Sequence, residues 1–173
     1  NGMVRPENIA DFSGRIYKEA NRLGNLVADI IQLSRLDEQQ DAVVSMESVE
    51  LDELAKDVVN NLRDHAEKKN ISLDYCGIPI NIQGVRHVLY EMLYNIADNA
   101  VRYTNPGGHI HIYVGRKGDR PFYRVEDDGI GIPKSEQKRI FERFYRVDKS
   151  RSKETGGTGL GLAIAKSFTE LQN

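Results

Sequence analysis

The chain has 173 residues, of which 39% are hydrophobic and 29% charged, and a formal net charge of −2. These values are ordinary for a soluble globular protein, with room for one medium domain and an appendage. The slight negative charge argues against a nucleic-acid-binding surface, which usually needs a basic excess. Cys76 is the single cysteine, so no internal disulfide can form. No apolar run reaches the roughly 20 residues that span a bilayer, so we expect a cytoplasmic chain without membrane contact of its own.

A long amphipathic helix is predicted over residues 7–36. Pro6 suits its first turn, and apolar residues recur at intervals of three and four. They form a narrow seam of the kind found in helical hairpins and bundles. The seam residues are Ile9, Phe12, Ile16, Leu23, Leu26, Ile30 and Leu33. A single helix cannot bury such a seam, so we expect its partner helix to be missing here or to belong to another chain.

A polar segment over 37–46 without periodicity is predicted to be a linker. The elements expected after it are a helix over 48–69 that stops at Asn70, short strands over 71–75 and 78–82, a helix over 85–103, and a hairpin of strands 109–114 and 122–126. A short helix over 135–145, a charged loop over 146–154 and a helix over 162–171 are expected to follow. Because no strand comes after the last helix, the domain is expected to be cut or incomplete at its C-terminal end.

Residues 91–104, EMLYNIADNAVRYT, carry a polar stripe on a helix with an apolar opposite face. Asn95 and Asn99 are four residues apart, so both amides project from one side, and Arg102 adds a cation at the same end. Two amides and a guanidinium suit a hydrated metal and a phosphate chain. A solvated helix face would explain the stripe equally well on its own.

Two glycine-rich segments favour the ligand interpretation. Gly156–Gly161 runs directly into an apolar helix, where close backbone approach and free N–H groups suit a triphosphate. It is neither a Walker loop nor a convincing dinucleotide fingerprint, since no Gly-Lys-Ser/Thr follows and no strand leads into it. Asp127 ends a strand and precedes Gly129 and Gly131, so its carboxylate could bind an exocyclic amine while a flat base lies against the glycines. As an alternative, this second segment is only a tight turn.

The histidines give a weak metal signal. His109 and His111 lie on one face of a predicted strand, but no third ligand accompanies them. We therefore expect them to be ordinary strand residues beside a turn.

Four motifs together resemble the C-terminal part of a sensor histidine kinase with a Bergerat-type (GHKL) ATP-binding domain. They occur in family order: Asn95–Tyr103 is similar to the N box, Asp127–Gly131 to the G1 box, Phe141–Arg146 to the F box and Gly157–Gly161 to the G2 box. The resemblance implies an α+β fold, a two-layer α/β sandwich with a mixed sheet packed on helices, preceded by a long bundle-type helix. It divides the chain into a partial dimerisation and phosphoacceptor hairpin with linker (1–45) and a catalytic ATP-binding domain that lacks its C-terminal strands (46–173).

The resemblance also implies ATP and Mg²⁺ as cofactors. Asn95 and Asn99 would hold Mg²⁺, and Asp127 would bind the adenine amine, with Thr158 assisting through water. The remaining nucleotide-binding positions would be Arg102, Tyr103, Gly129, Gly131, Gly159, Leu160 and Gly161.

Three of the implied positions are catalytic. Arg102, where the family more often has lysine, would contact phosphate, and Arg146 on the lid would approach the γ-phosphate. Asp98 occupies the position of a general base in related ATPases.

The implied activity is that of an ATP:protein-histidine phosphotransferase, with a response regulator receiver domain as partner and a homodimeric full-length kinase anchored in a membrane by upstream segments. The family's phosphoacceptor lies in an H-E-x-x-T-P type motif. None of the four histidines, His65, His87, His109 and His111, has that context, so the chain alone is not expected to phosphorylate itself. Two alternatives remain: a GHKL-type ATPase such as a type II topoisomerase, mismatch-repair protein or heat-shock chaperone, and an inactive nucleotide-binding module.

Overall fold

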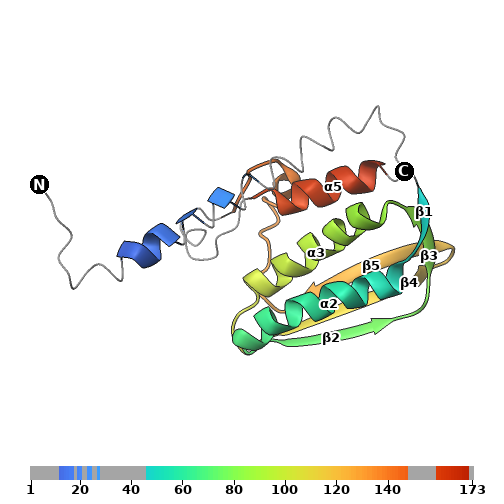
Figure 1. The fold of residues 1–173 in the computed structure, drawn as a ribbon, viewed down its shortest axis with the longest axis horizontal. Coiled ribbons are helices and arrows are strands. Elements are labelled where there is room, and N and C mark those ends of the chain that lie inside the picture. The colour runs from blue at the N-terminus through green and yellow to red at the C-terminus, as the bar shows by residue number, and fades with distance from the viewer. Residues whose placement is uncertain are drawn as a thin grey trace, which may run out of the picture.

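The structure is a computed structural model that describes residues 12–17, 19–20, 23–24, 27, 46–147 and 159–171 (Figure 1). All described residues between 12 and 27 are helical, as predicted for this part of the chain. The remainder of the predicted long helix, and the linker predicted over 37–46 apart from Met46, lie outside the described residues.

A short strand, β1 (Glu47–Glu50), opens the main body, where the sequence predicted helix from residue 48. β1 pairs antiparallel with β3 (Asn81–Gly84), which places Val49 opposite Ile82. Only four residues take part, and their partner lies some thirty positions along the chain, so local periodicity could not reveal the strand. The predicted helix start is therefore wrong.

Helix α2 (Leu51–Lys68) follows directly and buries one apolar face. Its inward residues recur every three or four positions. They are Leu51, Leu54, Ala55, Val58, Val59 and Leu62, which the sequence pattern predicts, and also Ala66. The helix ends where Asn70 adopts a left-handed backbone conformation with φ 55°, which terminates many helices. Asn70 is thus confirmed as the stop.

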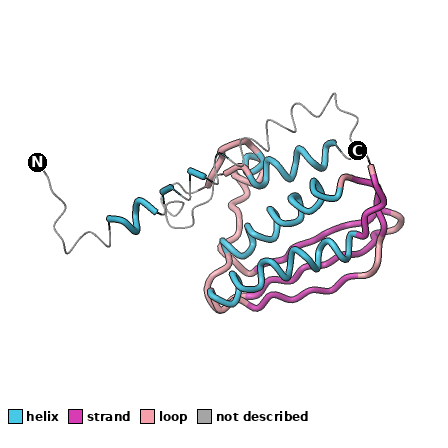
Figure 2. Tube along the Cα trace, in the orientation of Figure 1, coloured by secondary structure: helices cyan, strands magenta, loops and turns pink. Residues whose placement is uncertain are grey.

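A mixed three-stranded sheet lies under the helices (Figure 2). It has the order β2-β4-β5, with β2 (Ser72–Gly77) parallel to β4 (His109–Lys117) and β4 antiparallel to β5 (Arg120–Asp127). Alternate residues of β4 (Ile110, Ile112 and Val114) enter the same core as the apolar faces of α2 and α3 (Arg86–Tyr103). Helices packed on a mixed sheet confirm the expected α+β class.

The strand predictions were right in kind but not in bounds. The hairpin is present and longer than predicted, extending to Lys117 and restarting at Arg120. The strands predicted over 71–75 and 78–82 are displaced to β2 and β3, and they belong to different sheets because β3 pairs with β1.

The helix predicted over 135–145 is wrong. This segment contains only the 3₁₀ turn η2 (Arg139–Phe141), within a run of turns. Phe144 has φ 63°, a left-handed conformation that a regular helix cannot include. The last helix, α5 (Gly161–Leu171), starts one residue before its predicted position and packs on α3 through a cluster of Val88, Leu160 and Ile164.

None of the helices in the described ranges is long and apolar enough to cross a membrane.

Candidate functional site

The polar stripe of α3 is partly buried rather than freely solvated. On one side of the helix, Leu93, Ala97, Ala100 and Val101 are buried in the core. On the stripe itself, the side chains of Asn95, Asp98, Asn99 and Arg102 are only partly exposed. The helix is therefore fixed by its apolar face, and its polar groups lie where other segments cover them.

Within the stripe, Asp98 and Arg102 form an ion pair. The Arg102 Nε donates to Asp98 Oδ2 at 2.5 Å, and the two side chains are 32% and 18% exposed. This i,i+4 spacing lets each side chain hold the other along the helix face. Asp98 is thus engaged with a cation, which suits it to orienting the guanidinium.

The start of α5 lies against the stripe. A Cβ atom added at Gly161 would lie 3.0 Å from Asn95 Oδ1, so the Asn95 side chain would have to shift by a few tenths of an ångström to accept a larger residue there. Leu160, one residue earlier, is fully buried against α3. The first N–H groups of a helix have no partner within it, and α5 begins directly beside Asn95.

Gly159 packs against residues 144–146, which lead into the charged segment over 146–154. Its φ of +76° is a conformation that favours glycine. A Cβ there would lie 3.0 Å from the backbone of Phe144 and Tyr145 and from Arg146 Cγ. The structure therefore places the Arg146 side chain next to Gly159. Thr158, together with Gly156 and Gly157, lies outside the described residues.

The second glycine segment packs on the other end of α3. A Cβ at Gly129 would lie only 2.5 Å from the carbonyl oxygen of Tyr103, and the Ile130 N–H donates to that oxygen at 3.3 Å. The side chain of Asp127 is exposed, and its Oδ1 accepts the Gly129 N–H at 3.0 Å. Gly131 has φ +66° with open space around it. The carboxylate is therefore held in place and accessible to a ligand.

The neighbouring Asp128 was not among the predicted site residues. Its Oδ1 accepts the backbone N–H of His109 at 2.8 Å, and its Oδ2 lies 3.1 Å from His109 Nδ1. These hydrogen bonds hold the pKa of Asp128 below its ordinary value. Asp128 thus fastens the glycine segment to the start of β4, and the doubled aspartate in the motif was the signal available for it.

His109 and His111 do not share a ligand set in the described structure. His109 pairs with Asp128, whereas His111 Nδ1 lies 3.6 Å from Asp74 Oδ2 on β2. Each imidazole has a separate carboxylate partner on the exposed side of the sheet.

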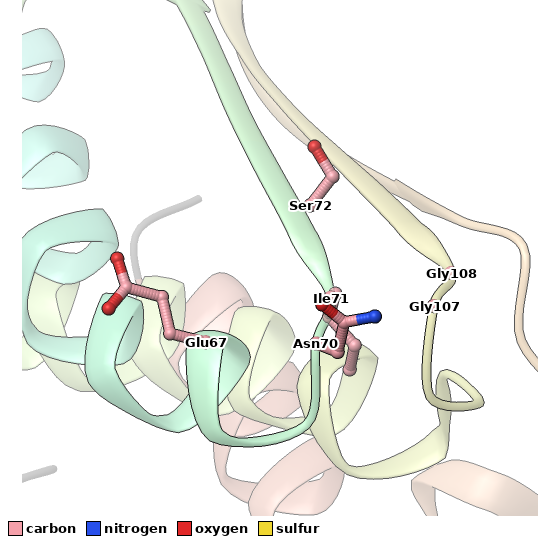
Figure 3. A pocket seen from close by; sticks show the side chains of 6 residues that line it. All are labelled: Glu67, Asn70, Ile71, Ser72, Gly107 and Gly108. Carbon is pink, nitrogen blue, oxygen red and sulfur yellow. The ribbon is translucent and has the colours of Figure 1, made fainter.

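A hollow lies between the end of α2 and the turn that precedes β4 (Figure 3). It is lined by Glu67, Asn70, Ile71, Ser72, Gly107 and Gly108, which come from the end of α2, the start of β2 and the turn before β4. It contains none of the predicted ligand-binding residues. Gly108 also approaches Asp128, since a Cβ there would lie 2.5 Å from the Asp128 Oδ1.

The segments that converge on α3 match one family. The model for "Histidine kinase-, DNA gyrase B-, and HSP90-like ATPase" matches residues 84–173, just over half of the chain. This range contains α3, both glycine segments and α5. The chain belongs to this family of ATP-binding domains, and its relatives make it the catalytic domain of a sensor histidine kinase. The expected family and the expected ATP-binding class are confirmed.

Two similar proteins illustrate the relationship. The sensor-like histidine kinase SenX3 of Mycolicibacterium smegmatis is 34% identical over 169 residues, which cover 97% of this chain and 44% of SenX3. The sensor histidine kinase RppB of Synechocystis sp. is 36% identical over 156 residues, covering 89% of this chain and 34% of RppB. The chain thus spans less than half the length of these curated relatives.

Solved structures agree with the fold. Full-length ShkA in complex with AMPPNP is 26% identical with a TM-score of 0.73, covering 98% of this chain and 35% of that chain. The mycobacterial sensor histidine kinase MprB is 27% identical with a TM-score of 0.64, covering 74% and 80%. ThkA in complex with the response regulator protein TrrA has a TM-score of 0.75 at 22% identity, covering 98% and 46%, and this similarity concerns the fold alone.

Proposed function

We propose that this chain is the ATP-binding part of an ATP:protein-histidine phosphotransferase of a two-component system. The observation that carries the proposal is the convergence of distant segments on α3. Gly161 lies against Asn95, and Gly129 lies against Tyr103 eight residues further along the same helix. Glycine at both contacts lets backbone approach the polar stripe from two sides, as a bound nucleotide requires.

Asn95 and Asn99 are proposed to hold Mg²⁺. Amide oxygens are among the hard ligands that Mg²⁺ accepts, and both side chains are partly buried on one side of α3, so the donor set fits the ion. When bound, the ion would neutralise charge on the phosphates. Arg102 would add a second positive charge, and the ion pair with Asp98 would keep its guanidinium oriented.

Asp127 is proposed to bind the adenine amine. One of its oxygens is fixed by the Gly129 N–H, and the exposed carboxylate can still receive a further donor. Tyr103, which is 37% exposed, and Gly131 would line the same pocket. Thr158 would assist Asp127 through a water molecule.

The segment at the N-terminal end of α5 is proposed to bind the triphosphate. The backbone of Gly159, Leu160 and Gly161 would meet the phosphates, since the Leu160 side chain is fully buried. Arg146, held beside Gly159, would approach the γ-phosphate.

In the proposed reaction, an imidazole nitrogen of the acceptor histidine forms a bond to the γ-phosphorus. The bond from that phosphorus to the bridging oxygen breaks, ADP leaves, and the imidazole proton passes to solvent. Positioning and charge neutralisation supply most of the rate enhancement in such transfers, which matches a site built of amides, an arginine pair and backbone N–H groups.

The wider arrangement is also a proposal. Residues 1–45 would contribute the second helix of a dimerising hairpin, and residues 46–173 would form the catalytic domain. ThkA is described in complex with a response regulator protein, and we propose a receiver domain as the next phosphoryl acceptor here. The domain would work in the cytoplasm as part of a homodimeric, membrane-anchored kinase, without contacting nucleic acid.

Phosphoryl transfer tests this proposal. The chain, mixed with the dimerisation hairpin encoded by the same gene and with γ-labelled ATP, is expected to label that hairpin's histidine with an acid-labile, base-stable bond. A hairpin in which that histidine is replaced by glutamine serves as the control and is expected to remain unlabelled.

Other outcomes would favour the alternatives. ATP hydrolysis without transfer would favour a GHKL-type ATPase. The ion pair between Asp98 and Arg102 argues against that alternative, because it engages the carboxylate that would act as the base. Nucleotide binding without either reaction would favour an inactive interaction module.

A further inference from the structure

The C-terminal turn of α3 does not end with a local cap. Thr104, which directly follows the last helical residue, is extended (φ −74°, ψ 136°), so the helix lacks the left-handed residue that commonly satisfies the last carbonyls. Such carbonyls need donors from elsewhere when they are not left to water. At this helix the donors come from two distant segments.

Lys69 supplies most of these donors. Its ammonium donates to the carbonyl oxygens of Val101 at 2.7 Å, Arg102 at 2.9 Å and Thr104 at 3.0 Å. The carbonyl of Ala100 accepts the Thr104 N–H at 2.9 Å, and that of Tyr103 accepts the Ile130 N–H at 3.3 Å. Every carbonyl from residue 100 to 104 therefore has a partner, and three of the five depend on one side chain.

Lys69 is well placed for this role. It follows the last residue of α2 and precedes Asn70, whose left-handed conformation turns the chain into β2. The side chain is partly buried, and this burial lowers the pKa of its ammonium. A cation at the negative end of the α3 dipole is also electrostatically favourable.

The turn that Lys69 contacts lies between the proposed phosphate-binding stripe of α3 and the segment that carries Asp127. Arg102 and Tyr103 belong to it, and the Tyr103 carbonyl is the surface against which Gly129 and Ile130 pack. A change of a few tenths of an ångström in this turn would move the Arg102 side chain and the Asp127 segment relative to each other.

We propose that Lys69 is a positioning residue of the nucleotide site, which fixes the end of α3 in register with the segment that carries Asp127. The inference rests on the proposed function, because it assumes that this site binds ATP. In the described structure the Lys69 ammonium donates its hydrogen bonds to backbone carbonyls of this turn, so Lys69 acts through the turn rather than on the ligand.

The test is Lys69→Met, which keeps the apolar stem and removes the donors. We expect ATP affinity, measured by calorimetry, to fall about tenfold, because without three charge-assisted hydrogen bonds the turn that carries Arg102 and Tyr103 is no longer fixed. Hydrogen exchange at the Ile130 amide is expected to accelerate, while exchange at Ile112 in the centre of β4 stays unchanged. The matched control is Lys68→Met, since Lys68 is exposed on the last turn of α2.

A second variant separates donation from packing. Lys69→Arg keeps the positive charge and several donors, and we expect it to bind ATP more tightly than K69M does. If K69M and K69R lost ATP affinity to the same extent, the proposal would be overturned. It would also be overturned if a folded K69M had wild-type ATP affinity and unchanged hydrogen exchange at Ile130. Should K69M not fold, Lys69→Gln decides: weaker ATP binding with faster Ile130 exchange supports the proposal, and wild-type values overturn it.

Failure of the proposed function would look different. If the wild-type chain itself did not bind ATP, the nucleotide assignment would be wrong. Ile130 exchange in the Lys69 variants would still report whether this side chain fixes the turn.

Discussion

Replacing Asn99 with alanine is expected to remove the Mg²⁺ dependence of ATP binding and to lower phosphotransfer at least about a hundredfold, since even outer ligand partners of metal sites cost 10–100-fold. The amide is partly buried on the stripe of α3, four residues from Asn95 and its contact with Gly161. Removing it leaves one of the two proposed amide ligands. The measurement is calorimetry with ATP in the presence of Mg²⁺ and in the presence of a chelator.

The control for this variant is Asn60→Ala, which removes an exposed amide from the surface of α2. N60A is expected to bind Mg-ATP like the wild-type chain. If N99A kept full, Mg²⁺-dependent binding, the assignment of Asn99 to the metal would have to be withdrawn.

Replacing Gly129 with alanine is expected to weaken ATP binding by more than tenfold and to destabilise the domain by about 1–3 kcal/mol, the usual cost of overpacking. The added methyl group would lie 2.5 Å from the Tyr103 carbonyl oxygen and 2.8 Å from Asp127 Oδ1. The first neighbour is backbone and cannot rotate away, so the segment carrying Asp127 must move off α3. Urea unfolding and nucleotide titration measure the two effects.

Gly118→Ala separates loss of stability from loss of the site. Gly118 has φ +62° with open space around it, in the turn at the opposite end of the hairpin from Asp127. Alanine in this left-handed conformation costs about 1–2 kcal/mol of backbone strain. We expect G118A to be destabilised like G129A but to bind ATP normally, and a G129A variant with normal affinity would contradict the proposed packing.

The helices and the hairpin could be predicted because their signals are local. Periods of three and four defined α2 and α3 to within a few residues, and alternation defined the hairpin. β1 was missed because four residues carry little pattern, and its strand character comes from pairing with β3. The segment over 135–145 has helix-compatible residues, yet Phe144 takes a left-handed conformation that the sequence does not announce.

The residues of the site could be named from their motifs, but their contacts could not. Asn95, Asp127 and the glycines stand out because amides, a carboxylate and glycine at those spacings suit a nucleotide. Gly161 approaches Asn95, and Gly129 approaches the end of α3. Both contacts depend on the packing of α5 and β5 on that helix, which the sequence pattern does not contain. Lys69 gave no signal, because the carbonyls it contacts lie 32 to 35 residues along the chain.

The measurement that tests the central claim most directly is titration of the folded wild-type chain with ATP, with and without Mg²⁺. We expect saturable binding of one ATP per chain, with a higher affinity when Mg²⁺ is present. Absence of ATP binding by protein shown to be folded by circular dichroism would contradict the assignment of the α3 stripe and its neighbouring glycine segments to the nucleotide.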